Sequence, residues 1–182
     1  MSTRNTLVRS MHDLGLAAWF GGTLMGAVGL NGGAAQATDP TERLKLSSAG
    51  WARWAPVQLL AMIVHGIGGV GLILGNKTRL AGQPKARHNT ALKLVTTVLA
   101  IAASVWAGLL GAQIARHADE GGEGVTEPTG TSSTALATAQ KQQRVGQWIA
   151  PALTGLLIVL AAQQGEQQRP AAGLLRSLRT RG

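Results

Sequence analysis

The sequence predicts an all-α fold: an integral membrane four-helix up-and-down bundle in which residues 1–182 form a single membrane domain. Three observations lead to this prediction. Four apolar stretches reach the ~20 residues that a helix needs to cross ~30 Å of hydrocarbon. These stretches contain no Asp, Glu or Arg, whereas a soluble domain would need amphipathic helices to form its surface. The basic residues also concentrate on one side of the expected membrane, as in other multi-pass proteins.

The first predicted span covers residues 14–34 and carries small residues at intervals of four, at Ala18, Gly22 and Gly26. Membrane helices associate where small residues let their backbones approach, because apolar side chains gain little by leaving lipid for one another. We therefore expect this face to pack against the second span. The segment before residue 38 also resembles a secretory signal peptide, whose cleavage would leave three spans in the same orientation. We favour the uncleaved chain because the apolar run is longer than a usual signal core.

The second predicted span covers residues 55–74 and follows an outer loop, residues 35–54, that is expected to be partly helical. Asp39 before a proline is typical of a helix start. Gly66 and Gly69 give the span its own small-residue face for packing on the first span. Residues 66–71 also match the G-x-G-x-x-G pattern of dinucleotide-binding sites. They follow no predicted strand and precede no acidic residue at the required distance, so helix packing explains them better.

The third predicted span covers residues 92–115 and follows a cytoplasmic loop at residues 75–91. Lys93 intrudes at the edge of this span, where its long side chain can reach the interface. The charge at this position is therefore compatible with a transmembrane helix.

The fourth predicted span covers residues 145–162, between an outer loop at 116–144 and a basic cytoplasmic tail at 163–182. The first part of the outer loop is rich in Gly, Glu, Thr and Ser, which indicates a flexible loop. Its last residues favour helix, so the fourth helix is expected to project beyond the outer surface. Pro151 is expected to kink this helix or to mark its second turn.

The basic residues predict the orientation, because Lys and Arg in short loops are retained in the cytoplasm. Of the 17 Lys and Arg residues, eleven fall on the side that receives both termini and the middle loop. The other side has six, together with six of the eight acidic residues. Trp51, Trp54 and Trp148 also fall at the outer interface, a position that tryptophan favours. The sequence thus predicts a cell (inner or plasma) membrane protein with cytoplasmic N- and C-termini.

The net charge of +9 does not indicate nucleic-acid binding in this arrangement. Nucleic-acid binding needs basic residues gathered on a folded surface with base-stacking aromatics, and here they lie at membrane edges. The expected partners are membrane lipids, including anionic headgroups that attract a nearby basic residue by ~1 kcal/mol. A protein partner or a second copy of the chain is also expected. The sequence has no cysteine, which excludes disulfides and thiol chemistry.

The candidate cofactor-binding residues are three histidines, His65, His12 and His88, with haem as the cofactor considered. No metal site and no catalytic residue are predicted, because no cluster of side chains has ligand spacing. At 1.5 Å per residue, His12 lies ~5 Å inward from Arg9 and His65 lies ~18 Å inward from Lys77. The resulting depth difference of ~13 Å disfavours His12 and His65 as a pair of haem ligands. A neutral His65 hydrogen-bonded to a neighbouring helix is the simpler interpretation, and we expect it to face inward.

The start of the first span, residues 11–22 (MHDLGLAAWFGG), resembles a group of uncharacterised small four-span actinobacterial membrane proteins. Residues 50–56 (GWARWAP) share this resemblance. More distantly, the opening is similar to copper-resistance-D-like proteins and to the membrane protoporphyrinogen oxidase that binds haem. The oxidase resemblance implies a histidine in the first span and a lysine in the third, positions that His12 and Lys93 could fill.

Two functions of different class follow. The leading one is a non-catalytic membrane module or an accessory subunit of a larger membrane complex, without a cofactor, because the spans hold small and apolar residues. The alternative is a haem-binding or redox membrane protein that uses His12, His65 or His88. A transporter or proton pathway is disfavoured because only His65 offers a mid-membrane site.

Overall fold

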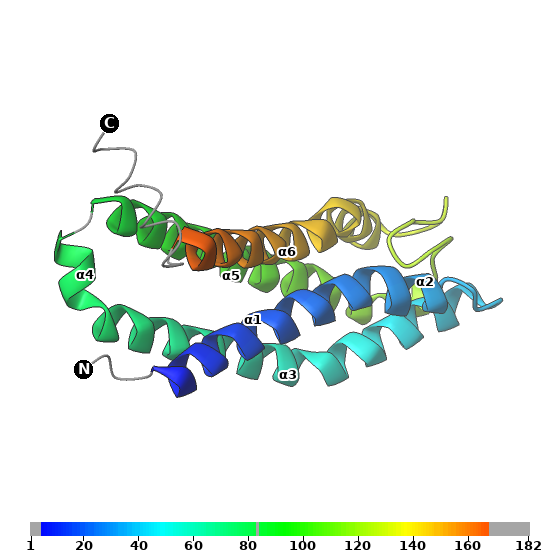
Figure 1. Ribbon diagram of the computed structural model, residues 1–182. Coiled ribbons are helices and arrows are strands. Elements are labelled where there is room, and N and C mark those ends of the chain that lie inside the picture. The colour runs from blue at the N-terminus through cyan, green and yellow to red at the C-terminus, as the bar shows by residue number, and fades with distance from the viewer. Residues whose placement is uncertain (1–4, 83, 168–182) are drawn as a thin grey trace.

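The computed structural model describes residues 5–82 and 84–167, which fold into a bundle of four long helices. The start of α1 and the short helix α4 lie at one end, and the links from α2 to α3 and from α5 to α6 lie at the other (Figure 1). Neighbouring helices run antiparallel, which confirms the predicted all-α four-helix bundle. The elements in chain order are α1 Thr6–Met25, the π-helical η1 Gly26–Leu30, α2 Asn31–Ala34, α3 Pro40–Gly75, α4 Lys77–Gly82, α5 Pro84–Arg116, the 3₁₀ turn η2 Ala118–Glu120 and α6 Thr134–Gln167.

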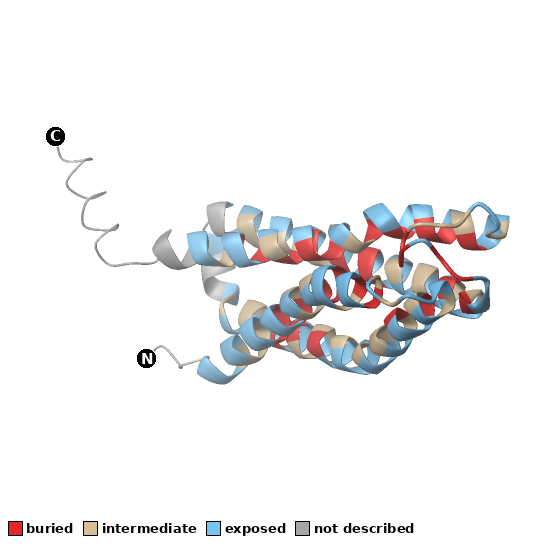
Figure 2. Ribbon diagram, turned by 90° about the vertical axis from the view of Figure 1, so that its right-hand side faces the viewer, coloured by how far each residue is buried: buried red, intermediate tan, exposed pale blue. Residues whose placement is uncertain are grey.

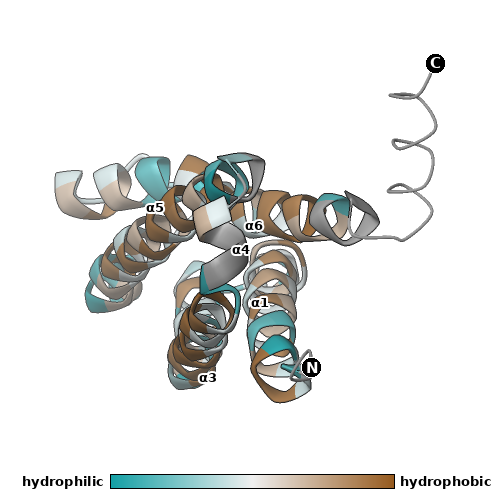
Figure 3. Ribbon diagram, turned by 60° about the vertical axis from the view of Figure 1, so that its left-hand side comes forward, coloured by the Kyte–Doolittle hydropathy of each residue, from teal (hydrophilic) through white to brown (hydrophobic). Residues whose placement is uncertain are grey.

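All four long helices are long and apolar enough to cross a membrane. Large apolar side chains such as Leu60, Val98 and Val159 lie exposed on the outside of the bundle, as expected where lipid is the solvent. Figure 3 shows apolar residues along the helices and hydrophilic ones mainly toward their ends. The candidate spans are Thr6–Ala34, Pro40–Gly75, Arg87–Arg116 and Thr134–Gln163.

The helices extend well beyond the spans that apolar content predicted. Residues 40–54 of the predicted outer loop belong to α3, and residues 77–82 of the predicted cytoplasmic loop form α4. Backbone hydrogen bonding continues into polar residues once a helix has left the hydrocarbon, so composition underestimates helix length. Pro151 lies inside α6. Of the predicted basic tail, residues 168–182 lie outside the described residues.

The helices form two antiparallel pairs, α1 with α3 and α5 with α6 (Figures 1 and 3). Buried residues lie along the inner faces of these pairs (Figure 2). One buried cluster, centred on Trp19, Ala61 and Ala100, joins α1, α3 and α5. A second cluster, which includes Leu44 and Leu136, lies near the loop-bearing end. The core is therefore divided into two parts along the bundle axis.

The start of α3 is capped as predicted, because the Asp39 carboxylate accepts a hydrogen bond of 2.8 Å from the backbone N–H of Thr41. This bond satisfies one of the N–H groups that a helix start leaves without a partner. It also holds the pKa of Asp39 below its usual range. The predicted cap is thus confirmed.

The segment between α5 and α6 packs on the bundle, although its composition suggested a flexible loop. Val125 and Thr126 are buried, and the Nε2 of Gln140 donates to the carbonyl oxygens of Gly124 and Val125. The Arg43 guanidinium donates to backbone carbonyls from both outer segments, those of Ala37, Thr38, Gly122 and Glu123. Buried backbone groups need partners, and these side chains supply them.

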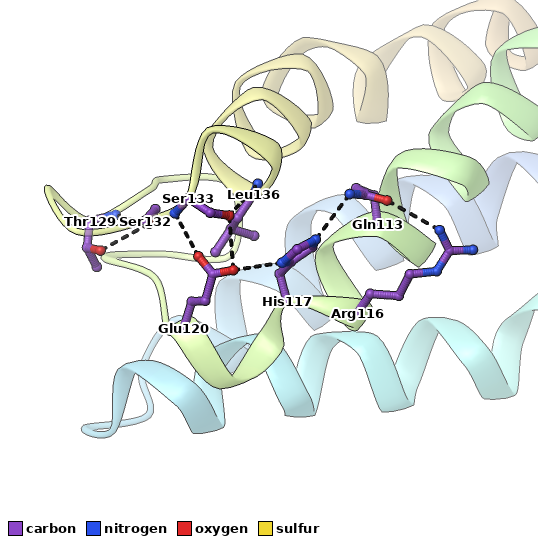
Figure 4. A network of polar contacts seen from close by, with 8 residues as sticks. All are labelled: Gln113, Arg116, His117, Glu120, Thr129, Ser132, Ser133 and Leu136. Carbon is purple, nitrogen blue, oxygen red and sulfur yellow. Dashed lines mark hydrogen bonds and ion pairs between the residues drawn. The ribbon is translucent and has the colours of Figure 1, made fainter.

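A chain of polar contacts closes the same end of the bundle (Figure 4). The Nδ1–H of His117 donates to Glu120 at 2.7 Å, and Glu120 accepts from the backbone N–H of Ser133 at 2.7 Å and from its hydroxyl at 3.0 Å. The Ser133 hydroxyl in turn accepts from the N–H of Leu136, which caps α6. The bond from the Ser133 N–H, with the bonds from its hydroxyl and from His117, lowers the pKa of Glu120. These contacts tie the end of α5 to the start of α6.

Candidate functional site

The closest approach of two helices is the crossing of α1 and α3. A Cβ placed on Gly15 of α1 would lie 2.6 Å from both the Ala61 carbonyl oxygen and the His65 backbone nitrogen. A Cβ placed on Gly68 of α3 would lie 2.6 Å from the Val8 carbonyl oxygen. In both directions the neighbouring atoms are backbone, so only glycine fits without a shift of a whole helix. The two backbones are in direct contact here, as small residues permit in membrane helices.

Further along the crossing, Gly22 and Gly26 face aromatic rings. Gly22 lies against the indole of Trp54, and Gly26 lies against that of Trp51. The sequence predicted only an interfacial position for Trp51 and Trp54. Their indole rings also fill the space beside these two glycines. An indole packed on a glycine buries a large apolar surface against backbone.

Two residues expected to pack do not lie on this face. Ala18 is exposed, since on a 3.6-residue turn it is rotated by about 60° from the line through Gly15 and Gly22. Gly66 is exposed and has no atom near the position of a Cβ, since it lies about 200° around α3 from Gly68. Gly69 does lie at the crossing, with the His12 ring 3.3 Å from the position of its Cβ.

The crossing brings His12 and His65 together. Their ring centroids are 4.1 Å apart, with the planes inclined by 42°. The Nδ1–H of His65 donates to the backbone carbonyl oxygen of His12 at 3.0 Å, which fixes the tautomer of a neutral His65. The expectation that His65 faces inward is confirmed, because only 3% of the residue is exposed. His12 is also 3.2 Å from the carboxylate of its neighbour Asp13.

The depth estimate that separated these histidines by ~13 Å is wrong. It assumed that Arg9 and Lys77 lie at one level, whereas the contacts of α1 with α3 pair Val8 with Gly71 and Asn5 with Gly75. Arg9 therefore lies about four residues, or ~6 Å, further along the bundle than Gly75. The register between the two helices, which brings the histidines level, is set by glycine contacts.

Other predicted residues are placed at different points around this crossing. Lys93 of α5 acts electrostatically on both His12 and His65, so the two positions suggested by the oxidase resemblance share one region. His88 is exposed near the start of α5 and takes no part in the ring contact. On the inner side, the His65 ring meets that of Trp19 edge to face, with centroids 6.1 Å apart. Trp19 donates to the Ser104 hydroxyl at 3.0 Å and so connects α1 to α5.

The ring contact of His12 and His65 also decides how they could serve a cofactor. Two axial imidazoles need the iron between them, with metal–nitrogen bonds of about 2 Å on opposite faces of the porphyrin. Rings in direct contact leave no space for that plane. His65 could act only as a single ligand, through Nε2. Among the described residues, no three His, Asp or Glu side chains gather in a geometry that could hold a metal ion.

A second feature, which sequence analysis did not identify, is a groove between α3 and α5 with a volume of about 490 Å³. It lies between the two buried clusters, toward the loop-bearing end. Small residues of α3 and α5 form most of its walls, and its floor is formed by polar residues of α1, α2 and α6 together with Ser104 of α5. Its polar residues are Thr23, Asn31, Ser47, Ser48, Gln58, Ser104, Gln143 and Gln147.

Asn31 is the centre of the polar floor. Its side-chain oxygen accepts from the Ser47 hydroxyl at 2.8 Å and from the Trp51 indole N–H at 2.9 Å. Its Nδ2 donates to the Gln147 side chain at 2.8 Å, so one amide connects α2, α3 and α6. The π-helical segment η1 lies directly before Asn31. In an α-helix, a residue four positions further along is rotated by roughly 40° from the first, so Asn31 would turn away from the face of Trp19. The wider π-helical turn of η1 compensates for this rotation and keeps Asn31 on the inner face with Trp19.

No protein-family model, curated protein or solved structure matches the chain.

Proposed function

We propose that this chain is a non-catalytic module of a bacterial inner membrane, held together by its α1–α3 pair. The observation that carries this proposal is the contact of His12 with His65 at the closest crossing of the two helices. The most deeply buried histidine uses one ring nitrogen to bind a backbone carbonyl and one ring face to pack on its neighbour. Both interactions join α3 to α1, so this intramembrane histidine has a structural role.

The proposed orientation places both termini and α4 in the cytoplasm. Eleven of the 17 basic residues support it, and they also favour attraction to anionic lipid headgroups at that face. Thr131 and Ala81 are exposed near opposite ends of the bundle and are therefore suitable labelling sites. In the cysteine-free chain, Thr131→Cys should react with an impermeant maleimide on intact cells and Ala81→Cys only after lysis. The reverse pattern would invert the orientation.

The proposed module acts with a partner, as an accessory subunit of a larger complex or as a homo-oligomer. Support comes from the exposed apolar faces of its helices, which contact either lipid or another membrane protein. Chemical crosslinking in native membranes tests this part of the proposal. A chain recovered only as a monomer after crosslinking speaks against it.

A haem-binding or redox role is the second candidate, favoured by the grouping of His12, His65 and Lys93 in one region. A visible absorption spectrum of the purified protein, oxidised and then reduced with dithionite, separates the two candidates. The non-catalytic module predicts a featureless spectrum after expression with added haem precursor. A Soret band that is lost in His12→Ala, His65→Ala or His88→Ala but kept in the control His117→Ala, at the loop-bearing end of the bundle, would overturn it in favour of a haem protein.

A further inference from the structure

We propose that the groove between α3 and α5 binds a neutral, lipid-soluble molecule that carries a hydrogen-bond donor. This site is separate from the histidine crossing and is independent of the function proposed for it. Its volume of about 490 Å³ lies within the range of small-molecule sites in proteins.

The groove is open toward the membrane between α3 and α5. Ala52 and Ala55 of α3 and Gly108 and Ala112 of α5 line the groove and are exposed. Small residues on facing helices normally let the two backbones close on each other. Here α3 and α5 stay apart, and a Cβ placed on Gly108 or Gly111 would meet no atom within 4 Å. A molecule dissolved in the bilayer can therefore reach the groove from the side.

The floor of the groove selects for a neutral molecule. It is made of buried hydroxyl and amide side chains, including Thr23, Asn31, Ser104 and Gln143. Every residue lining the groove is uncharged. A charged group placed in hydrocarbon without a counter-ion pays a large desolvation cost, whereas a neutral polar group needs only hydrogen bonds.

Gln143 determines that the ligand carries a donor. Only 7% of this residue is exposed, it lines the groove, and its side-chain oxygen has no hydrogen-bond partner among the described residues. A buried acceptor without a partner is costly, and rotation of the amide allows it to meet an O–H or N–H group that enters the groove. The Ser104 hydroxyl accepts from Trp19 and can donate its own hydrogen. The ligand is thus an amphipathic alcohol, phenol or amide with its polar group on the floor.

Photolabelling in nanodiscs tests this inference. The probe is octanol carrying a diazirine, and the comparison probe is octanoic acid with the same diazirine, which is ionised at neutral pH. Peptide mass spectrometry locates the labelled residues. We expect the alcohol to label residues 48–58 of α3 and 104–115 of α5, and the acid to label them much less.

Substitutions in the groove supply the controls. Gly111→Leu should abolish the labelling by filling the groove, whereas Gly66→Leu, an exposed glycine of α3 outside the groove, should leave it unchanged. Gln143→Leu should weaken binding of the alcohol roughly tenfold through the loss of one hydrogen bond. Gly108→Leu replaces Gly111→Leu if the latter does not fold, as judged by circular dichroism and gel filtration.

Labelling that persists in the folded groove-filling variants would show that the alcohol binds elsewhere. Equal labelling by the acid would refute the neutral class of ligand. Labelling confined to outward-facing residues would show a groove filled only by lipid or water.

Discussion

Replacing Gly15 with alanine tests the α1–α3 contact at its tightest point. The new Cβ would lie 2.6 Å from two backbone atoms of α3, where ordinary contacts begin near 3.4 Å, so the helices must separate by several tenths of an ångström. Overpacking of this kind costs about 1–3 kcal/mol. The alanine recovers about 0.5–1 kcal/mol, because glycine is unfavourable inside a helix.

Gly21 is the matched control, because it lies on the same helix and its Cβ would meet no atom within 4 Å. The gain in helix propensity is common to both variants, so their difference isolates the packing cost. We expect Gly15→Ala to be less stable than Gly21→Ala by about 1–3 kcal/mol.

The assay is equilibrium unfolding by dodecyl sulfate in maltoside micelles, followed by tryptophan fluorescence. Of the five tryptophans, Trp19 is fully buried next to His65, and Trp51 and Trp54 lie against Gly26 and Gly22, so three of them report on the packing of α3 on the first span. Equal midpoints for the two variants would refute the direct backbone contact, and with it the argument for a structural His65.

Three further perturbations address other parts of the bundle. Asn31→Ala should lower the free energy of unfolding by about 1–3 kcal/mol, because it removes the hydrogen-bond partner of the buried Ser47 and of the half-buried Gln147. An unchanged midpoint in the same assay would contradict this role. Arg43→Lys should speed hydrogen exchange in residues 121–127, because a lysine cannot donate to the four backbone carbonyls that the guanidinium binds. Exchange equal to wild type would show that these bonds do not order the segment. The folded-state pKa of Glu120 is lowered, so its stabilising contribution is complete above the unfolded value near 4.5 and is lost as the pH falls through the folded value. After correction for the intrinsic exchange rate, hydrogen exchange at the Ser133 amide should therefore become faster in acid in the wild type. In Glu120→Gln the corrected rate should be independent of pH.

The four helices and the packing of the first on the second could be predicted from local sequence. Apolar stretches of sufficient length identify membrane helices, and small residues along the first two spans indicate that these two pack together. The helix ends could not be predicted from hydropathy, as α3 shows by continuing outward to Pro40. Its true start was still visible in the sequence as the Asp39 cap.

The packing faces were only partly predictable. An interval of four residues correctly included Gly22 and Gly26 but drifts around the helix, which led to Ala18 instead of Gly15. Gly66 was included as one of the small residues of the second span, although it lies on the face of α3 opposite Gly68. Helical angles alone would have separated them, but they could not have identified which face meets α1.

The register between helices is what the sequence lacked most. Without it, His12 and His65 were placed at different depths, and the groove could not be foreseen, because it forms from segments more than 100 residues apart. One signal was present: Asn31, Gln143 and Gln147 are amides in or next to apolar spans, where unpaired polar groups are costly. Such residues are candidates for an internal polar network.

A disulfide crosslink in native membranes tests the α1–α3 register most directly. A Cβ on Gly71 would lie 3.0 Å from that of Val8, close to the ~3.5–4.5 Å of a disulfide, so Val8→Cys with Gly71→Cys should crosslink within one chain under mild oxidation. Gly66 faces away from α1, so Val8→Cys with Gly66→Cys should remain reduced. A crosslink in the second pair but not in the first would contradict the register that brings His12 and His65 together.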